Sequence, residues 1–338
     1  MTTRSEHLGA PAMRLILPLP GNETFARHLA DEGGWELGAM ETRRFPDGET
    51  YVRILSEVKD KVVDLVCTLA RPDDGFLRLI FAADAARDLG ARQVNLIAPY
   101  LSYMRQDRRF QPGEAVTSWS FARFVSSSFD RLLTVDPHLH RYPALSPLYT
   151  IPTDTLHAAP LLADWIAAEV DKPLIIGPDE ESDQWVSAIA ARIGAPYSVL
   201  QKTRHGDRNV EVRLPDLSRW RGLQPVLADD IASSGNTLIE AARQLPLQGF
   251  VRPVVAVVHA IFAEDSFQRL APLCARVVST DSVPHESNAV GLASLIARAI
   301  ASAPDDEGDL IRHRRPPEPQ DEVEQAGCHS FPASDPPS

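Results

Sequence analysis

The residues with the clearest capacity for chemistry lie at positions 225–238. A short apolar run is followed there by the adjacent acids Asp229 and Asp230, and then by small and hydroxylic residues. A loop of small residues between a strand and a helix exposes backbone N–H groups to an anion, and the helix dipole favours the same negative charge. The two carboxylates add acceptors for sugar hydroxyls or ligands for Mg²⁺. We therefore predict a sugar-phosphate site whose loop consists of Ser233, Ser234, Gly235, Asn236 and Thr237.

This interpretation has a structural alternative, because aspartate, serine and threonine favour turns and helix caps in proteins of any function. An acid-rich turn with one capping hydroxyl would show the same residue types. Asn236 is expected at a loop position with positive φ, which asparagine adopts more readily than most residues other than glycine.

Three arginines fall within residues 105–109, directly after an apolar run at 94–98. The planar guanidinium group donates two parallel hydrogen bonds to a phosphate, so this arginine segment suits a polyphosphate. A solvent-exposed charged surface is the alternative, with equal weight. Lys202 and Arg204, which alternate at the end of another predicted strand, could neutralise charge on a phosphoryl group during its transfer. For this pair an exposed basic turn is the alternative.

Two weaker signals complete the set. His138 follows the predicted strand at 132–135, where a neutral imidazole could bind Mg²⁺ weakly or contact a phosphate, although a structural histidine is the commoner outcome. The segment that contains Phe45, Asp47 and Glu49 shows only the Pro-Asp-Gly chemistry of a turn. The sequence contains no recognisable Walker loop, dinucleotide-binding glycine fingerprint, zinc-ligand spacing or Ser/His/Asp triad.

Alternating apolar strands and amphipathic helices must position these residues, and that alternation predicts parallel α/β sheets. The pattern occupies residues 12–153 and starts again over 154–303, with a break at 149–152, so we expect two α/β domains. Ligands of such sheets bind beyond the carboxyl ends of the strands, and the candidate residues all follow predicted strand ends. The expected strands span residues 13–17, 62–69, 94–98, 132–135, 174–177, 225–228, 253–258 and 276–279, and a final helix is expected at 289–301.

Length and composition limit the number of domains, the partners and the cellular location that can be expected. The 338-residue chain is long enough for two domains, and its net charge of −12 argues against nonspecific binding to nucleic acid. Half of that charge lies in residues 304–338, which carry nine acids, three arginines and seven of the 28 prolines, so this tail is expected to be disordered. The three cysteines show no metal-ligand spacing, and the longest apolar run, at 254–263, is too short to span a bilayer. We expect a reduced, cytoplasmic protein with small-molecule substrates and neither a nucleic-acid nor a membrane partner.

Five ordered segments resemble motifs of the ribose-phosphate diphosphokinases, which make phosphoribosyl pyrophosphate from ATP and ribose 5-phosphate. The resemblance covers residues 13–301, and its sugar-phosphate loop is most similar to that of the short, archaeal-type form. The segments are Arg-Phe-Pro-Asp-Gly-Glu at 44–49, Pro-Tyr-Leu-Ser-Tyr-Met-Arg-Gln-Asp-Arg at 99–108, Thr-Val-Asp-Pro-His at 134–138, the loop at 229–237, and Val-Pro-His at 283–285.

The resemblance implies an α/β fold of two type I phosphoribosyltransferase-like domains, with the site in the cleft between them. It also implies transfer of the β,γ-diphosphate of ATP to O1 of ribose 5-phosphate, with Mg²⁺ as cofactor, in a homo-oligomer of at least two subunits. Lys202 and Arg204 would stabilise the transition state, while His138 and Asp179 would hold Mg²⁺. The resemblance further implies adenine binding by Phe45, Asp47 and Glu49 of a neighbouring subunit, ATP binding by Arg105, Gln106 and Asp107, ribose binding by Asp229 and Asp230, and 5-phosphate binding by Ser233, Ser234, Gly235, Asn236 and Thr237.

Several positions depart from the family pattern. Ser234 and Asn236 stand where threonine and glycine are usual, and Pro137 stands where an aliphatic residue is common. Residues 179–182 lack the usual glycines and place two extra carboxylates, Glu180 and Glu181, near a site for phosphates. A non-catalytic regulatory homologue and a phosphoribosyltransferase are therefore alternative functions. A phosphoribosyltransferase would need neither the adenine segment nor the arginine segment, and the retained charged positions argue against a regulatory homologue.

Overall fold

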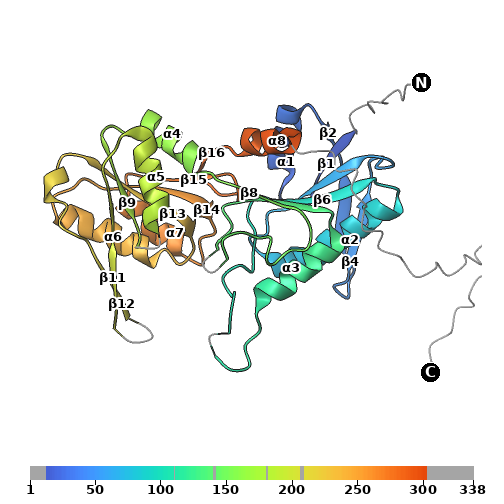
Figure 1. The fold of residues 1–338 in the computed structure, drawn as a ribbon, viewed down its shortest axis with the longest axis horizontal. Coiled ribbons are helices and arrows are strands. Elements are labelled where there is room, and N and C mark those ends of the chain that lie inside the picture. The colour runs from blue at the N-terminus through green and yellow to red at the C-terminus, as the bar shows by residue number, and fades with distance from the viewer. Residues whose placement is uncertain (1–12, 110, 140–141, 180–181, 206–208, 303–338) are drawn as a thin grey trace, which may run out of the picture. The chain divides into compact units, whose positions relative to one another are not determined.

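The apolar runs of the N-terminal half form one six-stranded sheet, shown in Figure 1. In this computed structural model the strand order is β2-β1-β5-β6-β7-β8, and all neighbouring strands are parallel. All five residues of β5 are buried, as expected for a central parallel strand covered on both faces. The strands are β1 (Arg14–Pro18), β2 (Glu36–Leu37), β5 (Val62–Val66), β6 (Gln93–Ala98), β7 (Arg131–Val135) and β8 (Thr153–Leu156).

The second half of the chain builds another six-stranded sheet, again with parallel neighbours. Its order is β10-β9-β13-β14-β15-β16, so the strand with the paired acids lies in the centre. The strands are β9 (Pro173–Gly177), β10 (Tyr197–Val199), β13 (Gln224–Ala232), β14 (Val254–Ala260), β15 (Arg276–Thr280) and β16 (Asn288–Val290).

Helices cover both faces of each sheet. The side chains of α2 and α3 pack on one face of the first sheet, and those of α1 and α8 pack on the other. Helix α8, the last of the described chain, lies beside α1 (Figure 1). On the second sheet, α4 and α5 pack on one face and α6 on the other. The helices are α1 (Glu23–Gly33), α2 (Pro72–Asp88), α3 (Thr117–Ser128), α4 (Ala159–Glu169), α5 (Asp183–Ile193), α6 (Asn236–Leu247), α7 (Ser266–Leu270) and α8 (Ala293–Ser302).

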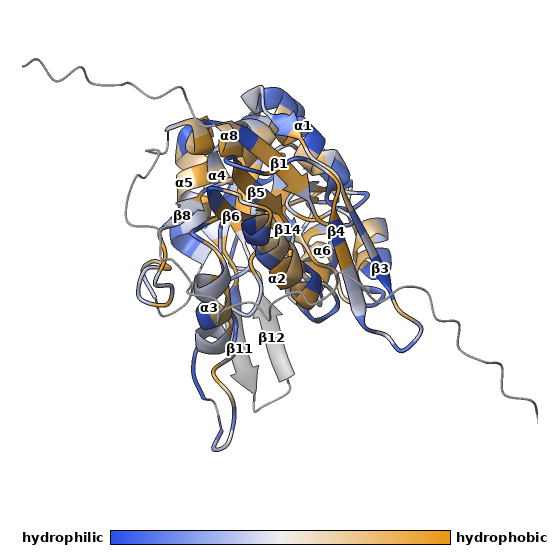
Figure 2. Cartoon of the chain, turned by 90° about the vertical axis from the view of Figure 1, so that its right-hand side faces the viewer, coloured by the Kyte–Doolittle hydropathy of each residue, from blue (hydrophilic) through white to orange (hydrophobic). Residues whose placement is uncertain are grey.

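One hydrophobic cluster joins the two sheets. It contains Ile16 and Val66 of the first sheet together with Ile175 and Val226 of the second, and all four side chains are inaccessible to solvent. Hydrophobic residues dominate the central strands, whereas the helices carry both hydrophobic and hydrophilic residues (Figure 2). Because both sheets pack into this one core, residues at the strand ends of the two sheets are held in fixed positions relative to one another.

Two antiparallel hairpins complete the fold. The first pairs β3 (Met40–Arg44) with β4 (Thr50–Ile54), and the second pairs β11 (Gln201–His205) with β12 (Asn209–Arg213). The structure describes residues 13–109, 111–139, 142–179, 182–205 and 209–302, except that the side chains of 202–205 and 209–213 are outside the description. The tail predicted to be disordered, 304–338, lies outside the described residues. Within these described ranges, no helix has the length and hydrophobicity to cross a membrane.

The sequence predictions of the fold are confirmed in class and in strand position, with three differences. Each expected strand occurs and starts within one residue of its predicted start. The strand β8, directly after the predicted break at 149–152, was not expected and extends the first sheet. The predicted final helix at 289–301 is wrong at its start, because β16 occupies Asn288–Val290 and α8 begins at Ala293. Strand β13 continues to Ala232, so the two acids lie within the strand and not after it.

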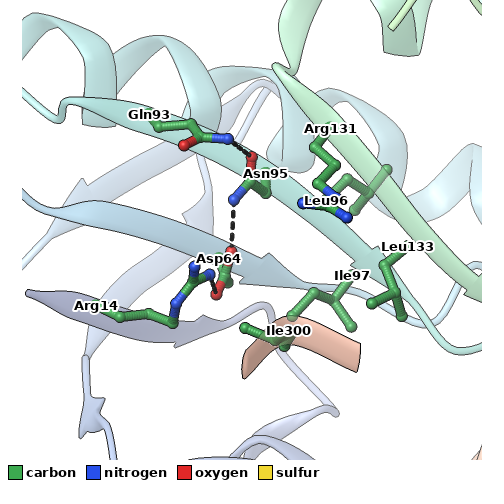
Figure 3. Close-up of a pocket in the computed structure, with 9 residues that line it drawn as sticks. All are labelled: Arg14, Asp64, Gln93, Asn95, Leu96, Ile97, Arg131, Leu133 and Ile300. Atoms are coloured by element: carbon green, nitrogen blue, oxygen red, sulfur yellow. Dashed lines mark hydrogen bonds and ion pairs between the residues drawn. The ribbon is translucent and has the colours of Figure 1, made fainter. Parts of the chain in front are cut away.

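A buried polar network lies in the first sheet, near the end of α8 (Figure 3). Asp64 is almost fully buried, and its carboxylate accepts hydrogen bonds from the Arg14 guanidinium and, at 2.8 Å, from the Asn95 amide. Burial raises the pKa of Asp64, and Arg14 opposes this effect without cancelling it. The adjacent cavity is about 20 Å³, which is room for roughly one water molecule. The network is thus a structural device that keeps a carboxylate paired inside the sheet.

Replacing Arg14 with leucine is expected to lower the free energy of unfolding by about 3–5 kcal/mol at neutral pH, because Asp64 would stay buried without a cation. The loss should shrink at acid pH, where Asp64 is protonated. Urea unfolding measures the change, and the double variant Arg14→Leu/Asp64→Leu should recover most of it. The control is Arg276→Ala, which removes an exposed ion pair with Glu169 and should have a much smaller effect. A single variant as stable as the wild type at neutral pH would contradict this account.

Candidate active site

The carboxyl ends of strands from both sheets meet at one place. His138 follows β7 of the first sheet, and its Nδ1 atom lies 2.8 Å from Oδ2 of Asp230 on β13 of the second sheet. Asp179 follows β9, the neighbour of β13, and its charge acts on Asp229. The structure therefore brings together four of the predicted site residues that lie far apart in the sequence.

The two adjacent acids of β13 have opposite electrostatic behaviour. Burial first, and then the charge of Asp230, raise the pKa of Asp229 well above its usual range, and Asp179 adds to the effect. Burial also disfavours the ionised form of Asp230, but the hydrogen bond and charge of His138 outweigh burial and lower its pKa to about 2. The backbone N–H of Asp230 donates to Oδ1 of Asp229 at 2.9 Å, which fixes the first carboxyl group. The site thus holds one carboxylate that is readily ionised beside one that resists ionisation.

The loop between β13 and α6 has the form of an anion site. Gly235 adopts φ 64° directly before α6, whose first turn contains no acidic residue and whose start has no side-chain cap. The first backbone N–H groups of such a helix can receive a negatively charged ligand. The carbonyl of Ser233 accepts hydrogen bonds from the Ala263 N–H at 3.1 Å and from Oγ of Ser266 at 2.9 Å. These bonds anchor the first residue of the loop.

The prediction that Asn236 adopts a positive φ is wrong. Asn236 is the first residue of α6, and the positive φ belongs to Gly235. Glycine pays no steric cost for this conformation, so the turn is made by the residue best suited to it. Ser234 and Thr237 lie on either side of this turn, as predicted for the loop.

The arginine segment reaches the same loop from the first sheet. Arg105 follows β6, and its Nη1 atom donates to Oγ of Ser233 at 3.4 Å. Gln106 is fixed through its backbone carbonyl, which accepts the N–H of Ser118 at 3.3 Å. Asp107 is buried, while the Arg105 side chain is exposed. The structure therefore places Arg105 against the anion loop.

The predicted adenine residues form the exposed tip of the β3–β4 hairpin. Within the tip, the N–H of Phe45 donates to the carbonyl of Glu49 at 2.8 Å, and the N–H of Glu49 donates to Oδ1 of Asp47 at 3.2 Å. Arg43 lies over the Phe45 ring at 4.5 Å from its centroid. The tip thus has a defined backbone while its side chains face solvent.

The two predicted catalytic cations lie on the second hairpin. Lys202 pairs with Val212 and Arg204 with Val210 in the β11–β12 register. Their side chains lie outside the described residues, so their roles stay predictions.

The predicted metal ligands are His138 and Asp179. In the part of the chain that the structure describes, no group of three or more His, Cys, Asp and Glu side chains is arranged to hold a metal ion. The donor set nevertheless fits Mg²⁺, which binds through one or two carboxylates and completes its shell with water and substrate phosphates. The electrostatics also fit, because repulsion by neighbouring carboxylates contributes to the raised pKa of Asp229, and a cation would relieve that repulsion.

His259 is a residue of the site region that the sequence interpretation treated as structural. It is fully buried in β14, and its ring contacts the carbonyl of Asp136 and the hydroxyl of Ser282. The one sequence signal was a histidine inside an otherwise apolar run, which does not distinguish a packed side chain from a functional one.

Comparison with known proteins agrees with the fold. Residues 15–128 match the family model for the N-terminal domain of ribose phosphate pyrophosphokinase, and residues 152–266 match that for the phosphoribosyl transferase domain. A crystal structure of phosphoribosylpyrophosphate synthetase from Mycobacterium smegmatis has the same fold, with a TM-score of 0.74 at 22% identity over 86% of this chain and 98% of that chain. Two phosphoribosyltransferase-type units in one chain thus define the class of protein.

Relatives by sequence narrow the class to one family. The ribose-phosphate pyrophosphokinase of Methanopyrus kandleri is 36% identical over 290 residues, which is 85% of this chain and 98% of that protein. That of Methanothermobacter thermautotrophicus is 32% identical over 84% of this chain and 98% of that protein. The chain belongs to the ribose-phosphate pyrophosphokinase family, which confirms the resemblance inferred from its motifs.

Proposed function

We propose that this protein is a ribose-phosphate pyrophosphokinase, which transfers the β,γ-diphosphate of ATP to O1 of ribose 5-phosphate and releases AMP. The observation that carries the proposal is the junction of β13 and α6. There the acids Asp229 and Asp230, near the end of β13, are followed by a short loop and the uncapped start of α6, and Arg105 from the other sheet contacts that loop. Carboxylates for sugar hydroxyls, N–H groups for one phosphate and a guanidinium for others match the two substrates.

Ribose 5-phosphate binds at this junction in the proposed complex. Asp229 and Asp230 accept hydrogen bonds from ribose hydroxyls, and the 5-phosphate lies against the backbone N–H groups of the loop and the first turn of α6. The hydroxyls of this loop add donors to the phosphate, and the residues concerned are Ser233, Ser234, Gly235, Asn236 and Thr237.

ATP binds on the side of the first sheet in this proposal. Arg105, Gln106 and Asp107 contact the nucleotide. The exposed hairpin tip with Phe45, Asp47 and Glu49 holds adenine in the site of a neighbouring subunit. The solvent exposure of the whole tip supports this role, because nothing in its own subunit needs to be displaced. A homo-oligomer of at least two subunits, a domain division at residues 153 and 154, and a cytoplasmic location stay predictions.

His138 and Asp179 would hold Mg²⁺, which when bound neutralises charge on the diphosphate and orients it. No covalent intermediate is required. O1 of the sugar attacks the β-phosphorus and the bond to the α-phosphate oxygen breaks, so the chain contributes mainly position and charge. Lys202 and Arg204 would neutralise charge on the transferred group, and the fixed β13–α6 loop holds the acceptor still.

The test is AMP formation by the purified protein in the complete mixture and in mixtures that each lack ATP, ribose 5-phosphate or Mg²⁺. AMP should form in the complete mixture only. A phosphoribosyltransferase would form no AMP from these mixtures, because it needs phosphoribosyl pyrophosphate and a free base as substrates and none of the mixtures contains them. Binding of ribose 5-phosphate with no AMP in any mixture would contradict the proposal and identify a regulatory homologue.

A further inference from the structure

His259 lies at the junction between the two sheets. Its side chain has no exposure to solvent, and its Nε2 atom is 3.2 Å from the carbonyl oxygen of Asp136, which follows β7 of the first sheet. Its Nδ1 atom is 2.8 Å from Oγ of Ser282, which follows β15 of the second sheet. Tyr100, from the loop after β6, packs edge-on against the imidazole with 4.9 Å between the ring centroids. One ring therefore bridges strand ends of both sheets.

The two contacts define the tautomer of the ring. A backbone carbonyl only accepts hydrogen bonds, so Nε2 of His259 must carry the hydrogen and donate it to Asp136. In a neutral ring Nδ1 is then the acceptor for the hydroxyl of Ser282, which has the carbonyl of Val258, at 3.1 Å, as its alternative acceptor. Burial lowers the pKa of His259, which favours the neutral ring that this arrangement requires.

The carbonyl that His259 holds belongs to a strained residue. Asp136 has φ 35°, a conformation that side-chain-bearing residues rarely adopt. Its backbone N–H donates to the carbonyl of Leu156 at 2.9 Å, and its carboxylate accepts the N–H of Ala158 at 2.8 Å. Those contacts fix the backbone N–H group and the side chain of Asp136. The hydrogen bond from His259 fixes its carbonyl, and hence the direction in which the chain continues.

That direction determines where His138 lies. Only Pro137 separates Asp136 from His138, and the proline ring fixes φ of the intervening residue. Rotation of the Asp136 carbonyl would therefore swing His138 away from Asp230, to which its Nδ1 atom lies 2.8 Å distant. On the other side, His259 is paired with Ile231, the residue directly after Asp230, in the β13–β14 register. Both partners of the His138–Asp230 contact are thus linked to residue 259, His138 through the imidazole ring and Asp230 through the strand pairing.

We propose that His259 is a positioning residue for the active site, which sets His138 against Asp230 through its hydrogen bond to the Asp136 carbonyl. It touches neither substrate. The consequence for catalysis rests on the proposed function, whereas the consequence for the position of His138 does not.

Two amide variants separate this role from general packing. The amide nitrogen of glutamine reaches the place of Nε2, while the shorter asparagine side chain reaches only the place of Nδ1. His259→Asn should therefore lower kcat by about 10- to 100-fold, with a much smaller change in KM for ribose 5-phosphate. His259→Gln should recover most of the loss, because it restores the donor to Asp136. The control is Ser279→Ala. It removes a fully buried hydroxyl group in β15, the strand next to β14, and should leave kcat near the wild-type value.

A second measurement needs no substrate. The NMR ring signals of His138 in the free protein should shift in His259→Asn and stay near their wild-type positions in His259→Gln and Ser279→Ala. Equal activity and equal His138 signals in the two amide variants would overturn the proposal, as would an active, folded His259→Asn protein with wild-type kcat. A wild-type protein that forms no AMP would contradict the proposed function alone, since the shift of the His138 signals is expected in either case.

Discussion

Replacing Asp229 with asparagine is expected to make the protein more stable and much less active. Burial and the charge of Asp230 raise the pKa of Asp229 in the folded protein above 3.8, the value of an unperturbed aspartate. At pH values between 3.8 and the raised pKa of the folded protein, the folded state holds a proton on Asp229 that the unfolded state has lost. The aspartate therefore lowers the free energy of unfolding progressively as the pH rises through this range. Asparagine has no such penalty and keeps Oδ1 as the acceptor for the N–H of Asp230.

Urea unfolding without metal or substrate measures this effect. The stability difference between Asp229→Asn and wild type should be small near pH 4 and should grow in favour of the variant as the pH rises. Its kcat/KM for ribose 5-phosphate should fall by about 10- to 100-fold, because one of the two side-chain oxygens that face the sugar hydroxyls is replaced by an N–H donor. An Asp229→Asn protein that is less stable than wild type at neutral pH would contradict the account.

Asp230→Asn is the matched variant, with the opposite expected effect on stability. Its carboxylate is the partner of His138, so its removal should destabilise the fold at neutral pH. Activity should fall by a similar factor, since this carboxylate also accepts from the ribose. Two adjacent aspartates with the same substitution should therefore lose activity together while their stabilities move in opposite directions.

Replacing Lys202 with alanine is expected to lower kcat by about 100- to 1,000-fold, because a cation that neutralises the transferring diphosphate would be lost. Substrate affinity should change less, since the proposed contact strengthens in the transition state. Steady-state AMP formation measures both parameters. The control is Gln201→Ala at the adjacent, exposed position of β11, which should retain wild-type kcat. AMP formation by Lys202→Ala at the wild-type rate would show that the role assigned to this lysine is wrong.

The strands were predictable because central parallel strands are buried on both faces and therefore read as nearly continuous apolar runs, interrupted only by Asp64 in β5 and by His259 in β14. Two strands that the sequence did not reveal, β8 and β16, lie at the edges of the six-stranded sheets. β8 reads Thr-Asp-Thr-Leu and β16 has three residues, so neither has the apolar run that marks a strand. The packing of α8 against α1 was also unpredictable, because it joins segments from opposite ends of the described chain.

The candidate site was predictable to the extent that it follows from strand ends. The acids of β13 and His138 after β7 were recognised because the carboxyl edge of a parallel sheet is where ligands bind. The contact between His138 and Asp230 was not, since it depends on how one sheet lies against the other. His259 was missed for the same reason: its partners come from segments more than 20 residues away on both sides, and only the fold shows them.

The central claim is that a diphosphate moves as one unit from ATP to O1 of ribose 5-phosphate. Phosphorus NMR of the complete reaction mixture tests it directly, because it distinguishes AMP, ADP, free phosphate and a diphosphate attached to the sugar. The account predicts that AMP and a sugar-linked diphosphate appear in equal amounts as ATP disappears. Formation of ADP or free phosphate in place of these two products would contradict it.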